Sequence, residues 1–363
     1  MPMTPLPTPA LVLDGAVVRS NLRRMASYVL SHRIGLRPHT KTHKSKKLAA
    51  MQLEAGAIGL TVAKVGEAET MAETGADLLM AYPAVDPARC ERLAKLALGR
   101  SVRVALDSAI AAEAVACAAQ KVGSTVGVLV DLDVGMGRTG VQSPHDALAL
   151  AQKIARMRGL RLDGIMIYPG HVWNPPSEQG PALRAIAAKL EETISLWREK
   201  GLEAKIVSGG STPTAFQSHL IPQLTEIRPG TYLFNDMNTV RGGFCSLDEC
   251  AARLVCTVVS DAVPGQVVID AGTKTLTSDR CIPAPESGHG YVVEYPEARI
   301  NALSEEHGQV DVTRCTNKPK VGERVTVIPN HICPCVNLQD ALWWQEAGHE
   351  PEPLSVDARG KVS

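Results

Sequence analysis

Lys41 stands in a segment that suits covalent chemistry. The octapeptide from Arg37 to Lys44 follows a short apolar run, residues 34–36, and precedes a helix-like run that begins near Ser45. A lysine between a strand and a helix lies at the carboxyl edge of a sheet, where its amine can form a Schiff base with a carbonyl cofactor. The alternative is a basic, solvated turn, because lysine-rich turns are common. The remaining motifs favour a catalytic Lys41.

Two glycine-containing segments suit a phosphate group. In residues 208–212, consecutive glycines permit close approach of the backbone, and serine and threonine hydroxyls add donors to the amides. Residues 228–231, Arg-Pro-Gly-Thr, follow the next predicted strand. Such sequences also occur in ordinary turns, but barrel enzymes often bind phosphate in this place. The residues predicted to bind the phosphorylated cofactor are Ser208, Gly210, Ser211, Thr212, Gly230 and Thr231.

Two arginines are placed to bind the rest of a pyridine cofactor. Arg228 ends the strand before the second glycine segment, where it could reach a ring nitrogen and keep that nitrogen unprotonated. The alternative is an ion pair between Arg228 and Glu226 or another acid. Arg138 lies in a glycine-rich loop, residues 133–140, and could hold the cofactor's phenolic oxygen or a substrate carboxylate.

Tyr168 and His171 follow another predicted strand, in the sequence Tyr-Pro-Gly-His. Tyr168 is assigned to the cofactor site. His171 could accept the proton of a substrate hydroxyl, because an imidazole titrates near neutral pH. The alternative is a histidine that caps the next helix.

A possible metal site lies near the C-terminus. His331 and Cys333 are two residues apart, so on an extended chain their side chains point to the same face. An imidazole and a thiolate on one face suit zinc or manganese, and two protein ligands leave positions open for water or substrate. Cys335 is either a third ligand or a packed thiol.

The elements that must position these residues follow a regular alternation. Short apolar segments alternate with longer runs rich in Ala, Leu, Glu and Lys, which indicates strands and helices of a parallel sheet. Eight such repeats predict a (β/α)8 TIM barrel, although an open doubly wound sheet is the alternative. The predicted strands are residues 34–38, 57–62, 77–81, 101–106, 125–132, 162–168, 204–208 and 224–228.

The pattern changes near residue 242 to β-rich runs separated by turns, without a long helical period. We expect a barrel over residues 14–241. Residues 1–13 and 242–363 form a second, mostly β domain, because the strand at residues 10–13 precedes the first helix.

Composition excludes several classes of protein. Lys+Arg and Asp+Glu both number 38, which argues against partners that are bound through charge, such as nucleic acids or membrane surfaces. No apolar run approaches a membrane span. The nine cysteines are odd in number and scattered, so reduced thiols and a cytoplasmic location are expected.

Four motifs together resemble the alanine racemase superfamily of pyridoxal-phosphate enzymes. They are Arg-Pro-His-Thr-Lys-Thr-His-Lys, the Gly-Met-Gly-Arg loop, Ser-Gly-Gly-Ser-Thr-Pro-Thr and Arg-Pro-Gly-Thr-Tyr. More narrowly, the chain from about Thr8 to Leu342 resembles the D-threonine aldolase and D-serine dehydratase family. The resemblance implies that Lys41 carries pyridoxal 5'-phosphate, that His331 and Cys333 bind a divalent metal, and that the chain forms a homodimer. His307 resembles a family motif near the metal.

The resemblance favours a lyase for small D-configured β-hydroxy amino acids, with retro-aldol cleavage to glycine and an aldehyde. His171 favours that outcome. Cys333 favours the alternative of a dehydratase that yields a keto acid and ammonia, because the aldolases of the family resemble His-x-Asp at this place. An amino acid racemase is a second alternative, but it needs no metal pair. A pyridoxal-phosphate carrier lacks a large β domain, so residues 242–363 argue against it.

Overall fold

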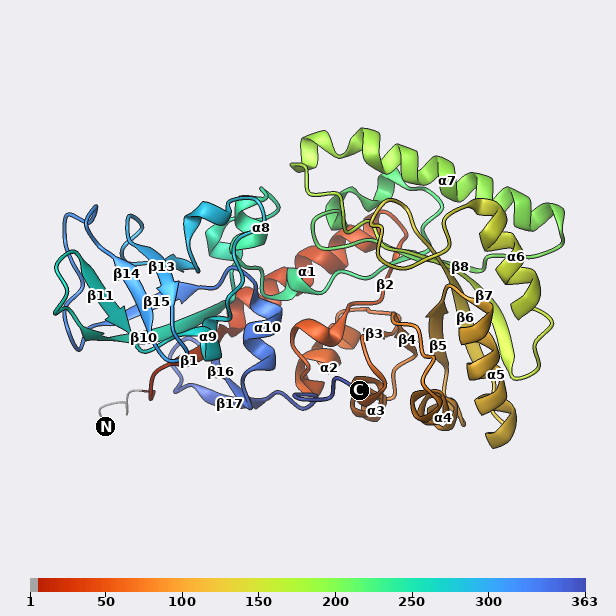
Figure 1. The fold of residues 1–363 in the computed structure, drawn as a ribbon, viewed down its shortest axis with the longest axis horizontal. Coiled ribbons are helices and arrows are strands. Elements are labelled where there is room, and N and C mark those ends of the chain that lie inside the picture. The colour runs from red at the N-terminus through yellow and green to blue at the C-terminus, as the bar shows by residue number, and fades with distance from the viewer. Residues whose placement is uncertain (1–5) are drawn as a thin grey trace. The chain divides into compact units, whose positions relative to one another are not determined.

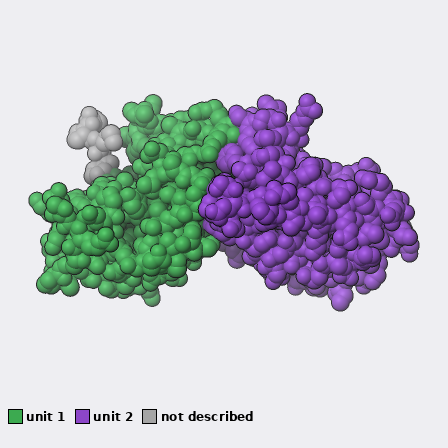
Figure 2. Space-filling view, turned by 90° about the horizontal axis from the view of Figure 1, so that it is seen from above, with its two compact units in different colours: residues 1–24, 42–45, 231–359 green, residues 25–41, 46–230, 360–363 purple. Residues whose placement is uncertain are grey.

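The computed structural model describes residues 6–363 and divides the chain into two compact units (Figure 2). We call unit 2, which consists of residues 25–41, 46–230 and 360–363, the barrel unit. Unit 1, the β unit, consists of the chain up to Arg24, residues 42–45 and residues 231–359. The division falls within helix α1 (Gly15–Ser31) and again immediately after Lys41.

The barrel unit contains a parallel sheet of eight strands in the order β2-β9-β8-β7-β6-β5-β4-β3 (Figure 1). Backbone hydrogen bonds from Ile58 N to Leu36 O and from Thr61 N to Pro38 O join the two ends of this order and close the barrel. The prediction of an eight-stranded TIM barrel is therefore confirmed. The strands are β2 (Gly35–Leu36), β3 (Leu60–Val62), β4 (Leu78–Met80), β5 (Val102–Leu106), β6 (Val126–Leu132), β7 (Leu160–Ile167), β8 (Ile206–Gly209) and β9 (Glu226–Ile227).

Helices connect these strands, and side chains fix where several of them begin. Asp86, Ser108 and Ser143 cap three helices by accepting a hydrogen bond from a backbone amide of the first turn. Inside the barrel, Leu79 and Leu129 pack with Ala105 and Met166 in a buried apolar cluster. The helices are α2 (Lys46–Glu54), α3 (Val65–Met71), α4 (Pro87–Leu96), α5 (Ala109–Val122), α6 (Pro144–Ile154) and α7 (Gly180–Glu199).

The β unit is built on a sheet of nine strands. Its path is β13-β14-β11-β10-β1-β16-β17, and β15 pairs with both β10 and β12. Strand β1 (Ala10–Asp14) runs antiparallel to β10 and parallel to β16, so the first strand of the chain belongs to this sheet. The other strands are β10 (Ala252–Ser260), β11 (Gln266–Ile269), β12 (Tyr291–Val292), β13 (Arg299–Leu303), β14 (Gly308–Asp311), β15 (Arg324–Ile328), β16 (Ala341–Gln345) and β17 (Glu352–Ser355).

Three short helices complete the β unit: α8 (Met237–Arg241), α9 (Thr273–Leu276) and α10 (Ile332–Asn337). All nine cysteines are free thiols. Among residues 6–363, no helix combines the length and the apolar character that crossing a lipid bilayer requires.

Candidate active site

Lys41 lies in a single 3-10 turn (Thr40–Thr42) that follows strand β2, and its side chain is exposed. The turn is held by Thr40, whose buried hydroxyl donates to Glu67 Oε1 at 2.6 Å. His39 N donates to Pro229 O at 3.1 Å, which ties the segment before Lys41 to the loop after the neighbouring strand β9. Lys41 therefore stands at the carboxyl end of the barrel, beside the loop that contains Arg228.

Lys44, three residues further on, has a different environment. It is buried in the β unit, and its Nζ donates to Asn337 Oδ1 at 2.6 Å. Only one of the two lysines that flank Thr42 and His43 thus lies in the barrel unit.

The loops after β8 and β9 form one cup. The two strands pair directly, and Arg228 N donates to Gly209 O at 2.9 Å. Gly210 has φ +78°, and a Cβ there would lie 3.0 Å from the side chain of Ile227, so the turn requires glycine. The buried Ser211 amide and hydroxyl both lie 3.1 Å from Thr214 Oγ1. A tight turn with amide and hydroxyl donors fits a phosphate group.

The remaining predicted phosphate ligands divide between the units. Thr212 is half-buried in the turn after Ser211, and Gly230 is the buried last residue of this barrel segment. Thr231 belongs to the β unit, where its Oγ1 lies 3.6 Å from Cys333 Sγ. The Thr231 hydroxyl therefore lies beside Cys333, one of the two predicted metal ligands.

Arg228 is 6% exposed and fixed by two hydrogen bonds. One donates to Ser208 Oγ at 2.7 Å and the other to Ile167 O at 2.8 Å, so they use two of the five donors of the guanidinium. Burial lowers the pKa of Arg228 to about 10, which leaves it protonated at neutral pH. The alternative of a direct pair with Glu226 is not observed, because Glu226 binds Arg37 and Ser208.

The glycine-rich loop after β6 presents Arg138. The Asp133 carboxylate accepts hydrogen bonds from the amides of Gly135, Met136 and Gly137 at 2.9–3.2 Å. Thr139 Oγ1 donates to Asp131 Oδ2 at 2.8 Å. These contacts hold the loop against the end of the strand.

Arg138, Tyr168 and His171 come together at the ends of β6 and β7. The Arg138 guanidinium lies 4.9 Å from the centre of the Tyr168 ring, a cation–π contact. The His171 ring lies over Gly135, where an added Cβ would come within 2.8 Å of Nε2. His171 does not cap the next helix: the N-cap position of α7 is Gln179. Its imidazole is exposed and can act on a ligand at the barrel mouth.

Asp131 was absent from the predicted site residues. It lies at the end of β6 and is 5% exposed, and burial raises the pKa of its carboxyl to about 6. Thr139 and the charges of Arg228 and Arg138 oppose this effect. The sequence did contain a signal for Asp131 as a site residue, because it is a charged residue in an otherwise apolar strand.

Asp131→Asn should stabilise the protein increasingly as the pH rises from about 4 to about 7. The folded-state pKa lies above the unfolded value, so the stability contributed by Asp131 is fully present below about pH 4 and is lost as the pH rises through about 6. A change from 3.8 to about 6 corresponds to roughly 3 kcal/mol. Urea unfolding at both ends of the range measures the difference, and exposed Asp261→Asn serves as the control. A difference for Asp131→Asn that is constant with pH would contradict this assignment.

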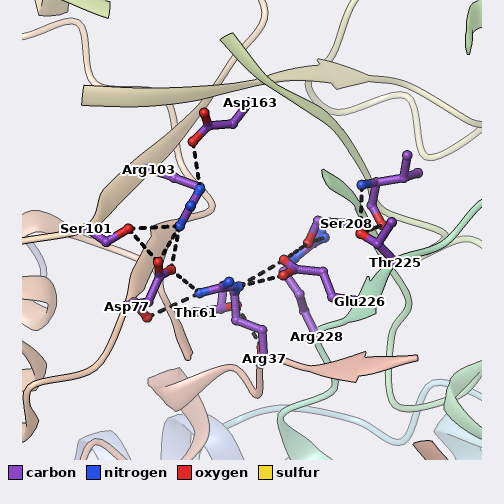
Figure 3. Close-up of polar contacts among 11 residues, drawn as sticks. Arg37, Thr61, Asp77, Ser101, Arg103, Asp163, Ser208, Thr225, Glu226 and Arg228 are labelled. Atoms are coloured by element: carbon purple, nitrogen blue, oxygen red, sulfur yellow. Dashed lines mark hydrogen bonds and ion pairs between the residues drawn. The ribbon is translucent and has the colours of Figure 1, made fainter. Parts of the chain in front are cut away.

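The barrel interior also contains a buried chain of alternating charges, which Figure 3 shows. Arg37, 4% exposed, donates from Nε to both oxygens of Glu226 at 2.9 Å and from a terminal nitrogen to Asp77 at 2.5 Å. Arg103 binds Asp77 at 2.6 Å and Asp163 at 2.7 Å. The chain thus joins residues at or beside strands β2, β4, β5, β7 and β9.

Arg37→Met should lower the free energy of unfolding by about 3–5 kcal/mol, because it leaves the buried Glu226 carboxylate without its counter-charge. Arg92→Met is the matched control. The pair of Arg92 and Glu69 is exposed, so its loss should cost about 1 kcal/mol or less. Equal losses of unfolding free energy for the two variants in urea would show that the buried ion pairs stabilise the protein no more than an exposed pair does.

The predicted metal pair lies in the β unit. His331 is the N-cap residue of α10, and Cys333 lies in the first turn of this helix. The premise of an extended chain was therefore wrong, because the segment is helical. The two side chains nevertheless meet in a hydrogen bond. Cys333 Sγ also lies 3.3 Å from Thr42 Oγ1.

His331 has the surroundings of a metal ligand. Its Nδ1 lies 2.8 Å from Asp279 Oδ2, and a carboxylate in this position orients an imidazole toward a metal. Burial opposes the charged form, but Cys333, Asp236 and Asp279 raise the pKa of His331 to about 9. A divalent ion bound by both side chains would replace this hydrogen bond between the imidazole and the thiol. The donor set fits two-ligand binding, and no group of three His, Cys, Asp or Glu side chains suited to a metal occurs in residues 6–363.

Cys335 and His307 lie outside this pair. Cys335 is buried, and its thiol donates to Leu276 O and His331 O at 3.3 Å. Because α10 is helical, Cys335 cannot share the face of Cys333, so it is a packed thiol. His307 is exposed in the turn between β13 and β14, and its carbonyl accepts from Ser304 N.

Known proteins resemble the whole chain. Residues 13–238 match the alanine racemase N-terminal domain, and residues 251–344 match a putative serine dehydratase domain. A D-threonine aldolase from Arthrobacter sp is 32% identical, with 99% of this chain and 94% of that protein covered. The crystal structure of D-threonine aldolase from Filomicrobium marinum has a TM-score of 0.90 at 32% identity and covers 99% of this chain and 97% of its own. A mutant of D-threo-3-hydroxyaspartate dehydratase in the metal-free form has a TM-score of 0.89 at 27% identity and covers 96% and 97%.

Proposed function

Because this chain belongs to the D-threonine aldolase and D-serine dehydratase family of alanine racemase-like enzymes, we propose that it is a lyase dependent on pyridoxal phosphate and a divalent metal. Its substrates are D-configured β-hydroxy amino acids. The observation that carries the proposal is the placement of Lys41 beside the loop of Arg228 and the adjoining glycine cup, at the carboxyl ends of neighbouring barrel strands.

The residues around this cup fit pyridoxal phosphate. Lys41 would hold its carbonyl carbon, the turn at Gly210 and Ser211 its phosphate, and Arg228 its ring nitrogen. Arg138, stacked on Tyr168, is placed for its phenolic oxygen or a substrate carboxylate. When bound, this cofactor supplies an electron sink for the bond that breaks at the substrate's Cα.

His331 and Cys333 would hold the divalent ion, zinc or manganese, with Asp279 orienting the imidazole. Such an ion supplies a Lewis acid for the β-hydroxyl of the substrate. The metal-free form named for the dehydratase mutant supports a metal in this family.

Retro-aldol cleavage to glycine and an aldehyde is the proposed outcome. His171, exposed at the barrel mouth, is the base that accepts the hydroxyl proton when the Cα–Cβ bond breaks. The second candidate, dehydration to a keto acid and ammonia, is favoured by Cys333 in the place where aldolases of the family resemble aspartate. In that reaction the Lys41 amine removes the α-proton and the hydroxyl departs.

We further propose that the enzyme is a cytoplasmic homodimer that acts on free amino acids. The free state of all nine cysteines supports a reducing compartment. Sedimentation velocity of the purified protein with bound cofactor should give a particle of twice the chain mass.

Product identity tests the proposed function. The protein is incubated with D-threonine or D-serine, pyridoxal phosphate and zinc or manganese. An aldehyde with glycine identifies the aldolase, and a keto acid with ammonia identifies the dehydratase. L-threonine is the stereochemical control and should not react. Appearance of the L-enantiomer without an aldehyde or keto acid would replace both lyase reactions with the racemase.

A further inference from the structure

Ser208 occupies the centre of a short hydrogen-bond relay that ends at Arg228 (Figure 3). Its hydroxyl is fully buried and donates to Glu226 Oε1 at 2.6 Å. Ser208 Oγ in turn accepts from a terminal nitrogen of Arg228 at 2.7 Å. A serine hydroxyl has one proton, so donation to Glu226 leaves its oxygen only the role of acceptor toward Arg228.

Arg37 fixes the direction of this relay. Its Nε donates to both oxygens of Glu226, which is 2% exposed, so both of these oxygens act as acceptors. An ionised carboxylate can only accept hydrogen bonds.

We infer that Ser208 and Glu226 are positioning residues that hold Arg228 as a fixed cationic donor toward the ring nitrogen of the cofactor. The inference rests on the proposed function. It also gives Ser208 a different task from the phosphate contact expected from the sequence, because its proton and its oxygen are both engaged inside the barrel. A protonated ring nitrogen would be a second donor facing the Arg228 guanidinium, which can only donate, so this arrangement favours an unprotonated ring nitrogen.

Two substitutions at Ser208 separate the relay from phosphate binding. Ser208→Ala removes the link but leaves the ion pair of Arg37 and Glu226 intact, and Ser208→Thr keeps a hydroxyl. With pyridoxal phosphate labelled with 15N in the ring, the resonance of the bound cofactor should move toward that of a protonated pyridine in Ser208→Ala and stay at the wild-type position in Ser208→Thr. The dissociation constant of the cofactor should rise about tenfold in Ser208→Ala, the effect of about 1.4 kcal/mol.

The cofactor-free protein provides a second measurement. Inorganic phosphate competes with pyridoxal phosphate for this protein, and the competition gives its affinity for phosphate. That affinity should be unchanged within about twofold in Ser208→Ala, whereas Ser211→Ala should weaken it. A loss of phosphate affinity in Ser208→Ala, with no change in the ring resonance, would overturn the relay and restore Ser208 as a phosphate ligand.

Glu226 is tested together with Arg37. The double variant Arg37→Met/Glu226→Met removes the buried pair as a unit, which costs far less than removing one partner. It should move the ring resonance in the same direction as Ser208→Ala. Asp163→Asn, in the same ionic chain but without contact to Ser208, is the control and should leave the resonance unchanged.

The outcomes distinguish this inference from the proposed function. A wild-type protein that binds no pyridoxal phosphate contradicts the proposed function. A wild-type protein that binds it, with a ring resonance unaffected by Ser208→Ala, contradicts only the relay. A shift in Ser208→Ala without one in the double variant removes Glu226 from the relay.

Discussion

Lys41→Ala should abolish the visible absorption of protein-bound pyridoxal phosphate and lower lyase activity by a factor on the order of 10⁴ or more. The amine must stand at the carboxyl end of the barrel beside the loop of Arg228, where the segment of Lys41 is tied to Pro229. The nearest candidate, Lys44, is buried in the β unit and donates to Asn337. Absorption spectra of the purified variant and single-turnover assays measure both effects.

Borohydride reduction followed by peptide mapping identifies the labelled lysine directly. The label should appear on Lys41 in the wild type and nowhere in Lys41→Ala. Lys47→Ala, in helix α2, is the matched control and should keep the wild-type spectrum. A label on Lys44 would mean that the covalent chemistry has been assigned to the wrong lysine.

Removal of the divalent metal should lower turnover of D-β-hydroxy amino acids by a factor on the order of 10³, while the absorption of bound cofactor stays the same. The effect on turnover is large because a Lewis acid at the hydroxyl supplies several kcal/mol to bond cleavage. The cofactor survives because its proposed contacts come from the barrel unit, whereas His331 and Cys333 belong to the β unit. The protein is dialysed against a chelator, and the metal per subunit, the turnover and the absorption spectrum are measured at each step. These measurements test both the loss of turnover and the unchanged cofactor absorption.

Substitutions rank the contributions within the metal site. His331→Ala should remove the metal. Asp279→Asn should weaken metal affinity by about 10–100-fold, since it only orients the imidazole. Cys333→Asp should retain some metal and shift the ratio of aldehyde to keto acid. Cys335→Ser is the control that should keep the metal, because that thiol donates to backbone carbonyls. Full turnover of these substrates without any bound metal would contradict a metal-dependent lyase.

The sequence by itself determined the barrel and the order of its loops. Apolar strands alternating with amphipathic helices admit few other folds, and all eight strands formed within a few residues of their predicted ranges. Because parallel strands place their carboxyl ends at one edge, the positions of Lys41, Arg138, Tyr168, His171 and Arg228 at that edge followed from the strand assignment. The β-rich runs after residue 242 indicated a β domain but not the order of its strands, because strand pairing joins segments far apart in the chain.

Only the tertiary structure decided which side chains share a hydrogen bond. Ser208 was expected at a phosphate, yet its hydroxyl joins Arg228 to Glu226, because the barrel brings the inward faces of β8 and β9 together. Asp279 reaches His331 across 52 residues of sequence, and Thr231 lies beside Cys333. Periodicity records which face a residue occupies, whereas a hydrogen bond depends on the distance between two atoms from segments far apart in the chain. Such atoms come within hydrogen-bond distance only when the sheets have formed and packed.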